Sequence, residues 1–169
     1  MNGVIRFDAV SKQFGRQVAL DNVSFHVPPG VVFAFLGENG AGKTTAIRIM
    51  LGLEQADCGD VHVLDKESRH QGLEIRGRVG YLPERPTLYD WMTVAEIGWF
   101  TAGFYGEPFL PAYLRQIQQF EIPVDRRLRH LSKGMRAKVA LSLAMAHQPE
   151  LLILDEPTSG LDTMVRREF

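Results

Sequence analysis

The fold is decided by the stretch Val31-Val32-Phe33-Ala34-Phe35-Leu36-Gly37-Glu38-Asn39-Gly40-Ala41-Gly42-Lys43-Thr44. Its first six residues are apolar on both faces, which predicts a strand inside a parallel sheet. The residues that follow fit the pattern G-x-x-x-x-G-K-[ST] at every fixed position, between Gly37 and Thr44. From Thr44 to about Leu51 the pattern is helical, and Gly52 is well placed to end the helix. A strand, a glycine-rich loop and a helix in this order predict a nucleotide-binding phosphate loop.

The residue types of this loop suit phosphate chemistry. Glycines let backbone N–H groups turn toward phosphate oxygens, and the start of the helix adds its positive end. We expect Lys43 to reach the β- and γ-phosphates and the Thr44 hydroxyl to ligate Mg²⁺. A chance match in a chain this long has a frequency on the order of 1% or less. The expected nucleotide-binding residues of this segment are Gly37, Glu38, Asn39, Gly40, Ala41, Gly42, Lys43, Thr44 and Thr45.

Two carboxylates follow a second run that is apolar on both faces, Leu151 to Leu154. Ligands of open parallel sheets lie beyond the carboxyl ends of the strands, so Asp155 and Glu156 should face the phosphate loop. Asp155 is expected to hold Mg²⁺, and Glu156 to act as general base for an attacking water. Pro157 predicts an extended backbone at Glu156. The alternative, a solvated acidic pair, is favoured only where no phosphate loop is present.

Composition places the chain among ordinary soluble globular proteins. It has 169 residues, 45% hydrophobic and 23% charged, with a formal net charge of −1 and one cysteine. This balance gives no electrostatic footprint for nucleic acid. A single cysteine excludes a disulfide framework, and no apolar run has transmembrane length. We therefore expect one cytoplasmic domain without a signal peptide.

The remaining patterns predict a mixed α/β protein. Near both ends of residues 4–27, apolar and polar residues alternate, as in strands with one face exposed to solvent. A helix is expected from Lys133 to about His147, with Ser132 as its N-cap. The expected architecture is a P-loop NTPase core with a parallel sheet, an N-terminal antiparallel β subdomain and a small helical subdomain at about residues 90–147. The other expected elements are strands at Val4–Asp8, Val23–Val27, Val61–Leu64 and Val79–Leu82 and helical structure from Met92 to about Phe120.

Further motifs point to one family. The run Leu131-Ser132-Lys133-Gly134-Met135 precedes the second helix, and Pro157-Thr158-Ser159-Gly160-Leu161-Asp162 follows the carboxylates. With the phosphate loop, these segments resemble the nucleotide-binding domain of ABC transporters. The resemblance runs from about Val4 to Phe169 and implies hydrolysis of ATP with Mg²⁺.

The resemblance assigns roles to single residues. Phe14 matches the aromatic residue that stacks on adenine, and Asp162 matches an aspartate that connects the two sites of a dimer. Glu84 occupies a position where glutamine is usual and where the side chain touches Mg²⁺ and the attacking water. The resemblance thus implies that Lys43, Glu84 and Glu156 are catalytic and that Thr44, Glu84 and Asp155 contact the metal.

The residues Ser132, Lys133, Gly134 and Met135 form a second helix start suited to an anion. One chain needs only one phosphate cradle, so this second one suggests the ATP of another copy. In the family, two domains dimerise head to tail, and each signature caps the γ-phosphate held by its partner. Lys133 and Met135 depart from the usual L-S-G-G-Q signature, although related exporters resemble L-S-K-G-M. An ordinary capped helix is the alternative.

The aromatic residues of the helical region are expected to form its core. The resemblance places this region beside the groove that receives a helix of a separate transmembrane permease. The family implies an ATPase subunit of a bacterial exporter of drugs, antibiotics or lipids, peripheral on the inner face of the membrane. The alternatives are a soluble ABC protein acting on the ribosome or DNA, and a nucleotide-binding remnant. The aromatic residues are Trp99, Phe100, Phe104, Tyr105, Phe109 and Tyr113.

One more expectation concerns the end of the chain. The family's switch histidine lies on a strand beyond the helix after Asp162, whereas all five histidines here precede Asp155. The resemblance therefore predicts one ABC domain over residues 1–169 that is incomplete at its C-terminus, with weak hydrolysis by this chain alone.

Overall fold

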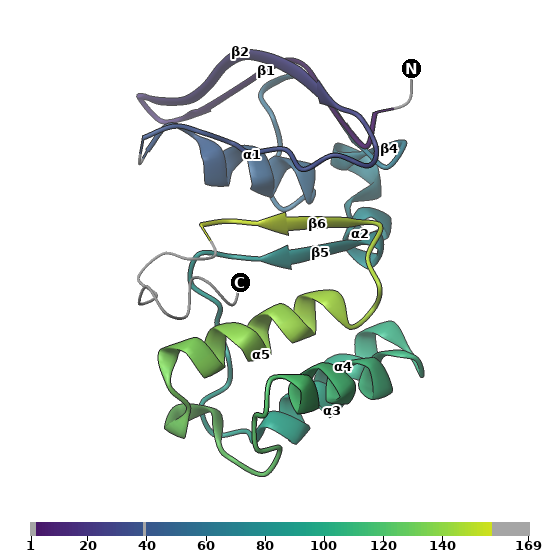
Figure 1. Cartoon of the computed structure of the whole chain (residues 1–169). Coiled ribbons are helices and arrows are strands. Elements are labelled where there is room, and N and C mark those ends of the chain that lie inside the picture. Colours follow the sequence, from purple (N-terminus) through teal and green to yellow (C-terminus); the bar gives the residue numbers. More distant parts are fainter. Residues whose placement is uncertain (1–2, 39, 157–169) are drawn as a thin grey trace. The chain divides into compact units, whose positions relative to one another are not determined.

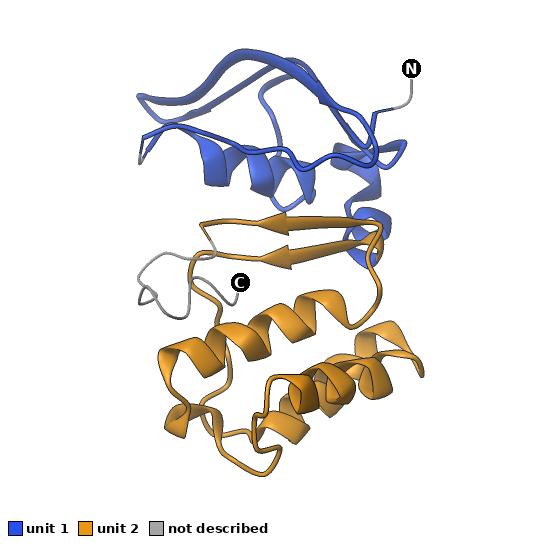
Figure 2. Cartoon of the chain, viewed as in Figure 1, with its two compact units in different colours: residues 1–77 blue, residues 78–169 orange. Residues whose placement is uncertain are grey.

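The computed structural model describes residues 3–38 and 40–156 (Figure 1). The chain divides into two compact units, residues 1–77 and 78–169 (Figure 2). The expectation of a single ATP-binding domain stays a prediction.

The first unit carries an antiparallel sheet with the order β2-β1-β3-β4. Its long strands β1 and β2 form a hairpin in which Ile5 pairs with Val27 and Phe14 with Gln17. The alternating pattern at the start of β1 buries Ile5 and Phe7 and leaves Arg6 exposed, as a one-sided sheet requires. The expected N-terminal antiparallel subdomain is confirmed. The strands are β1 (Ile5–Phe14), β2 (Gln17–Val27), β3 (Cys58–Val63) and β4 (Lys66–Glu67).

Two helices complete the first unit. Helix α1 (Lys43–Met50) begins at the phosphate loop and buries Ile47, Ile49 and Met50. The expected helix is confirmed with a start one residue earlier. Helix α2 (Ser68–Arg78) was not expected from the sequence, because its polar residues and two glycines show no apolar periodicity.

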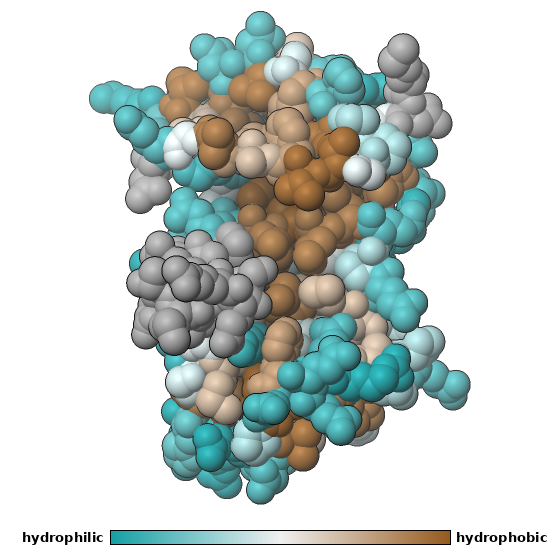
Figure 3. All heavy atoms as spheres, viewed as in Figure 1, coloured by the Kyte–Doolittle hydropathy of each residue, from teal (hydrophilic) through white to brown (hydrophobic). Residues whose placement is uncertain are grey.

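The expected strand at residues 31–36 does not form. These residues belong to no strand, and Val32 and Leu36 are almost fully exposed. A strand apolar on both faces needs neighbours to complete its ladder, and no described strand pairs with this segment. The rings of Phe33 and Phe35 pack instead on Phe25 of β2. Apolar residues consequently gather on the surface of this unit (Figure 3).

The second unit carries a parallel pair of strands, β5 (Val79–Leu82) and β6 (Leu151–Leu154), in the register Val79 with Leu151 to Leu82 with Leu154. Both strands have the predicted bounds. Arg78 donates two hydrogen bonds to the Glu150 carboxylate, at 2.6 and 2.8 Å, and ties the starts of the two strands together. Leu152 and Leu154 are exposed, so the prediction that β6 is buried on both faces is wrong. Among the described residues, β5 is the sole strand that pairs with β6.

Helices fill the rest of the second unit. They pack around one apolar core whose largest members include Phe109, Tyr113 and Leu128. The buried Tyr113 hydroxyl donates to the Val94 carbonyl at 2.8 Å, which satisfies the polar end of this core residue. None of the described helices is long and apolar enough to cross a membrane. The helices are α3 (Val94–Tyr105), α4 (Phe109–Gln119), the 3-10 turn η1 (Leu128–His130) and α5 (Lys133–Met145).

Candidate nucleotide site

The phosphate loop lies in the first unit, where a left-handed glycine starts α1. Gly42 has φ 84° and ψ 4° and is the N-cap of the helix, with no side-chain cap. A Cβ at Gly42 would meet the Ala19 carbonyl oxygen, so glycine is required both by φ and by close approach. The first turn of α1 carries no acidic residue. The N–H groups at this end are therefore suited to bind an anion.

Lys43 lies over the same loop. Its ammonium donates to the carbonyl oxygens of Gly37 at 2.6 Å and Glu38 at 3.2 Å. The Glu38 carbonyl also accepts from the Ala41 N–H, which closes the turn of the loop. Thr44 is exposed and Thr45 is half-buried on the first turn. Asn39 lies outside the described residues.

Phe14 is in the same unit, at the end of β1. Nearly half of its side chain is exposed, at 47%. The Lys12 ammonium lies 5.0 Å from the centre of the ring. Sequence reasoning missed Lys12, although its spacing of two residues from Phe14 on a strand places both side chains on one face.

The carboxylates lie in the second unit, at one edge of the parallel pair. Asp155 follows β6 and is 5% exposed, and its N–H donates to the Leu82 carbonyl at 2.9 Å. This bond extends the ladder by one residue, so Glu84 and Glu156 also follow the carboxyl ends of paired strands. Both are exposed. The structure therefore brings three of the predicted carboxylates to one sheet edge.

The backbone at Glu156 differs from the prediction. Its φ is 49°, in the left-handed region, and not extended as Pro157 led us to expect. Asp155 and Glu156 form a bend after β6, and a positive φ at Glu156 fits this bend. A left-handed residue other than glycine costs free energy, and six other described residues share this conformation with Glu156.

The signature residues lie at the start of α5. Ser132 is the predicted N-cap: its hydroxyl accepts from the Met135 N–H at 3.2 Å, which confirms that prediction. The first turn of α5 has no acidic residue. Ser132 and Lys133 are exposed, while Gly134 and Met135 are half-buried. Asp162 lies outside the described residues.

The two groups of residues have complementary chemistry. The first unit supplies backbone N–H groups, an ammonium and a hydroxyl, which suit phosphate and a hard metal ion. The second supplies carboxylates, which suit a metal ion and a water nucleophile. No cluster of three or more histidine, cysteine or acidic side chains suited to a metal occurs within residues 3–38 and 40–156.

Comparison with known proteins decides the family. The profile of the ABC transporter family matches residues 20–159, which include the phosphate loop and both carboxylates. The chain belongs to this family. The ABC chain is 36% identical over 168 residues to the Nod factor export ATP-binding protein I of Paraburkholderia xenovorans (strain LB400), covering 96% of this chain and 55% of that protein.

The chain is also similar to other ABC proteins. The chain is 34% identical over 171 residues to the probable multidrug ABC transporter ATP-binding protein YbhF of Escherichia coli (strain K12), covering 98% of this chain and 30% of that one. A solved ATP-binding subunit of an ABC transporter has a TM-score of 0.82 and 31% identity, covering 97% of this chain and 70% of that one. The ABC chain thus has the cassette fold, and it spans about half the length of the first curated relative.

Proposed function

We propose that the chain binds and hydrolyses ATP, with Mg²⁺, as the subunit that energises an ABC-type membrane exporter. The observation that carries this proposal is the start of α1, where a glycine N-cap, an acid-free first turn and Lys43 are suited to bind an anion. The relative from Paraburkholderia xenovorans is named for export of Nod factor, which supports the direction of transport. The transported compound is taken to be a drug, an antibiotic or a lipid-like molecule.

Phosphate binding follows from the groups in the first unit. The Lys43 ammonium donates to the carbonyls of Gly37 and Glu38, and phosphate oxygens are stronger acceptors for a cation. We infer that Lys43 exchanges these carbonyls for the β- and γ-phosphates. The N–H groups from Gly40 to Thr45 then donate to the same phosphates. Phe14 is proposed to stack on the adenine.

Magnesium fits the oxygen donors of this chain. Hydroxyl and carboxylate oxygens are the hard ligands that Mg²⁺ prefers, and the proposed ligands are Thr44, Asp155 and Glu84. Bound Mg²⁺ neutralises charge on the phosphates. Glu84 adds one negative charge where the family usually places glutamine. Asp155 is held in place by its N–H bond to Leu82.

Hydrolysis is proposed to use Glu156 as general base. Its carboxylate takes a proton from water as the water oxygen bonds to the γ-phosphorus, and the bond from that phosphorus to the bridging oxygen breaks. ADP leaves with the electron pair of the broken bond. Glu156 is exposed at the sheet edge that also carries Asp155 and Glu84. Family membership supports this role of Glu156.

Two substitutions test this assignment. Lys43→Ala removes the cation of the phosphate site, so ATP affinity falls by at least about tenfold. Glu156→Gln keeps the shape of the side chain but removes the base, so ATP binds normally while phosphate release falls by about 100-fold or more. Binding is measured by calorimetry and hydrolysis by released phosphate. Unchanged turnover in Glu156→Gln rules out Glu156 as the base.

We infer that the active form is a head-to-tail homodimer. The exposed Ser132 and the acid-free start of α5 support a role of the signature on the ATP of a second copy. Lys133, Gly134 and Met135 are proposed to take part, and Asp162 is proposed as a dimer contact. No nucleic acid partner is proposed.

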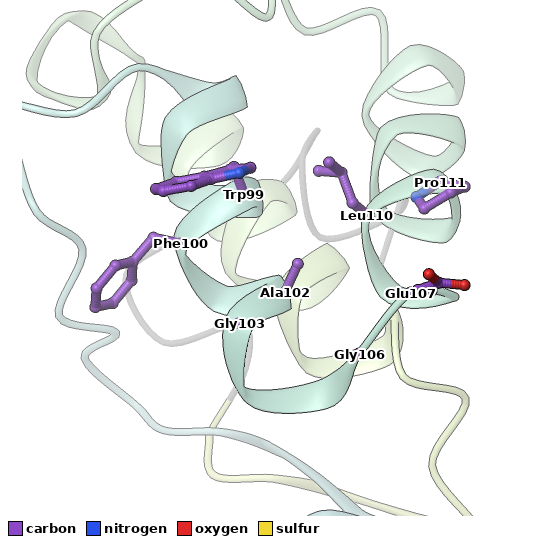
Figure 4. Close-up of a pocket in the computed structure, with 8 residues that line it drawn as sticks. All are labelled: Trp99, Phe100, Ala102, Gly103, Gly106, Glu107, Leu110 and Pro111. Atoms are coloured by element: carbon purple, nitrogen blue, oxygen red, sulfur yellow. The ribbon is translucent and has the colours of Figure 1, made fainter.

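The permease is proposed to contact the helical part of the second unit, which would hold the chain at the inner face of the membrane. Phe109 and Tyr113 are core residues as expected, but Trp99 and Phe104 are more than 70% exposed. A cavity of about 580 Å³ opens between α3 and α4 (Figure 4). Apolar surface of this kind supports a protein contact. The cavity is lined by Trp99, Phe100, Ala102, Gly103, Gly106, Glu107, Leu110 and Pro111.

A further inference from the structure

Lys12 is an enclosed cation beside the proposed base-stacking residue. Its side chain is only 11% exposed, which is unusual for lysine unless the ammonium is paired. The ammonium lies 3.1 Å from a carboxylate oxygen of Glu54 and 3.1 Å from one of Asp57. It also lies 5.0 Å from the centre of the Phe14 ring. Two carboxylates and one aromatic ring therefore surround a single ammonium.

Both acidic residues make hydrogen bonds with the backbone. The second oxygen of Asp57 accepts from the Gln13 N–H at 2.7 Å, and the Asp57 N–H donates to the Ser11 carbonyl at 2.9 Å. The Glu54 N–H donates to the Arg48 carbonyl at 3.3 Å, in the turn that ends α1. The ammonium is thus held between the end of β1 and the turn after the phosphate-loop helix.

The direction of each pKa shift agrees with this geometry. Hydrogen bonds to Glu54 and Asp57 raise the pKa of Lys12, and the Lys12 ammonium lowers the pKa of Glu54. The Gln13 N–H, followed by Lys12, lowers the pKa of Asp57. All three groups are therefore charged at neutral pH, and the cluster persists across the physiological range.

The Phe14 ring has the Lys12 ammonium over one face. A cation over an aromatic face is attracted by the negative charge of the ring face. The ammonium occupies one side of the ring, and the exposed remainder of Phe14 stays open to a ligand. Base stacking needs an aromatic face in one orientation, so a ring that is already held loses less entropy on binding.

We propose that Lys12 is a positioning residue for the nucleotide base: anchored by Glu54 and Asp57, it holds the Phe14 ring on which the base stacks. The inference rests on the proposed function, in which Phe14 stacks on adenine. Lys12 acts on the base through Phe14. Its loss therefore weakens the binding of ligands that carry a base and leaves the binding of phosphate-only ligands unchanged.

The test compares ATP with inorganic tripolyphosphate, which has no base, by calorimetry on the full chain. Phe14→Leu is expected to raise the Kd for ATP by about five- to 100-fold. Lys12→Ala is expected to raise it by about two- to fivefold and to leave the Kd for tripolyphosphate unchanged. Lys12→Arg keeps the cation and restores ATP affinity. In a Phe14→Leu background, Lys12→Ala has no further effect.

The outcomes separate the two levels of the proposal. Lys12 is merely structural, and the inference is overturned, if Lys12→Ala weakens the binding of ATP and of tripolyphosphate equally. The same holds if Lys12→Ala weakens ATP binding as much in the Phe14→Leu background as in the unaltered chain. If the unaltered chain binds no ATP, or Phe14→Leu changes nothing, the proposed function or its base platform fails instead. Should Lys12→Ala not fold, the pair Glu54→Gln and Asp57→Asn removes the anchors and must weaken ATP alone.

Discussion

The starts of α1 and α3 show two opposite ways to treat a helix N-terminus. At α3, the Thr93 hydroxyl accepts from the Glu96 N–H and the Glu96 carboxylate accepts from the Thr93 N–H. At α1, Gly42 offers no side chain, and the first turn has no acid. The first arrangement satisfies its N–H donors internally and places a negative charge over them, whereas the second leaves room for an external anion.

The start of α5 lies between these extremes. Ser132 satisfies one N–H, but no acidic side chain covers the turn. This combination stabilises the helix and still favours an approaching phosphate. The three helix starts therefore predict different responses to substitution.

Gly42→Ala is expected to have the largest effect. Its Cβ meets the Ala19 carbonyl and its φ is left-handed, so the free energy of unfolding falls by about 2–4 kcal/mol. Gly40→Ala is the matched control, because Gly40 is also left-handed, with φ 89°, but has open space around it. Its expected cost is about 1–2 kcal/mol. Urea unfolding without nucleotide measures the free energy of unfolding of both variants. Equal costs would show that the close approach of residue 42 to the Ala19 carbonyl does not contribute.

Ser132→Ala and Thr93→Ala are expected to have smaller and similar effects on stability, about 1 kcal/mol each, because each removes one N-cap. Their effects on hydrolysis differ. Ser132→Ala lowers ATP turnover through the proposed signature, whereas Thr93→Ala leaves the turnover of folded protein unchanged. Urea unfolding and phosphate release measure the two quantities.

A further substitution separates capping from anion binding at α5. Ser132→Asp restores the cap, since aspartate is a good N-cap, but places a carboxylate where a phosphate is proposed to approach. Stability then returns while turnover stays low. Recovery of turnover with Ser132→Asp would show that the start of α5 acts on stability alone.

Local patterns explain what the sequence could predict. The bounds of β5 and β6, the start of α1 and the cap at Ser132 depend on neighbouring residues: apolar runs, a glycine loop and a serine before a helix. The same motifs identified the family that the profile match shows. The roles of single site residues remain predictions.

Long-range structure explains what the sequence could not predict. A strand at residues 31–36 needs a partner strand, and apolarity alone does not supply one. Helix α2 buries Ser68, Gly72 and Ile75, so its packing is not visible as an apolar stripe. Lys12 meets Glu54 and Asp57 from more than 40 residues away, and no local pattern marks that cluster.

The most direct test of the central claim is an NMR titration of the amide groups with ATP. The account predicts saturable shifts of the N–H signals from Gly40 to Thr45, at the start of α1. It predicts no such shifts from Val94 to Ile97, where Thr93 and Glu96 already close the start of α3. ATP binding that leaves the start of α1 unshifted, or that shifts both helix starts alike, would contradict the account.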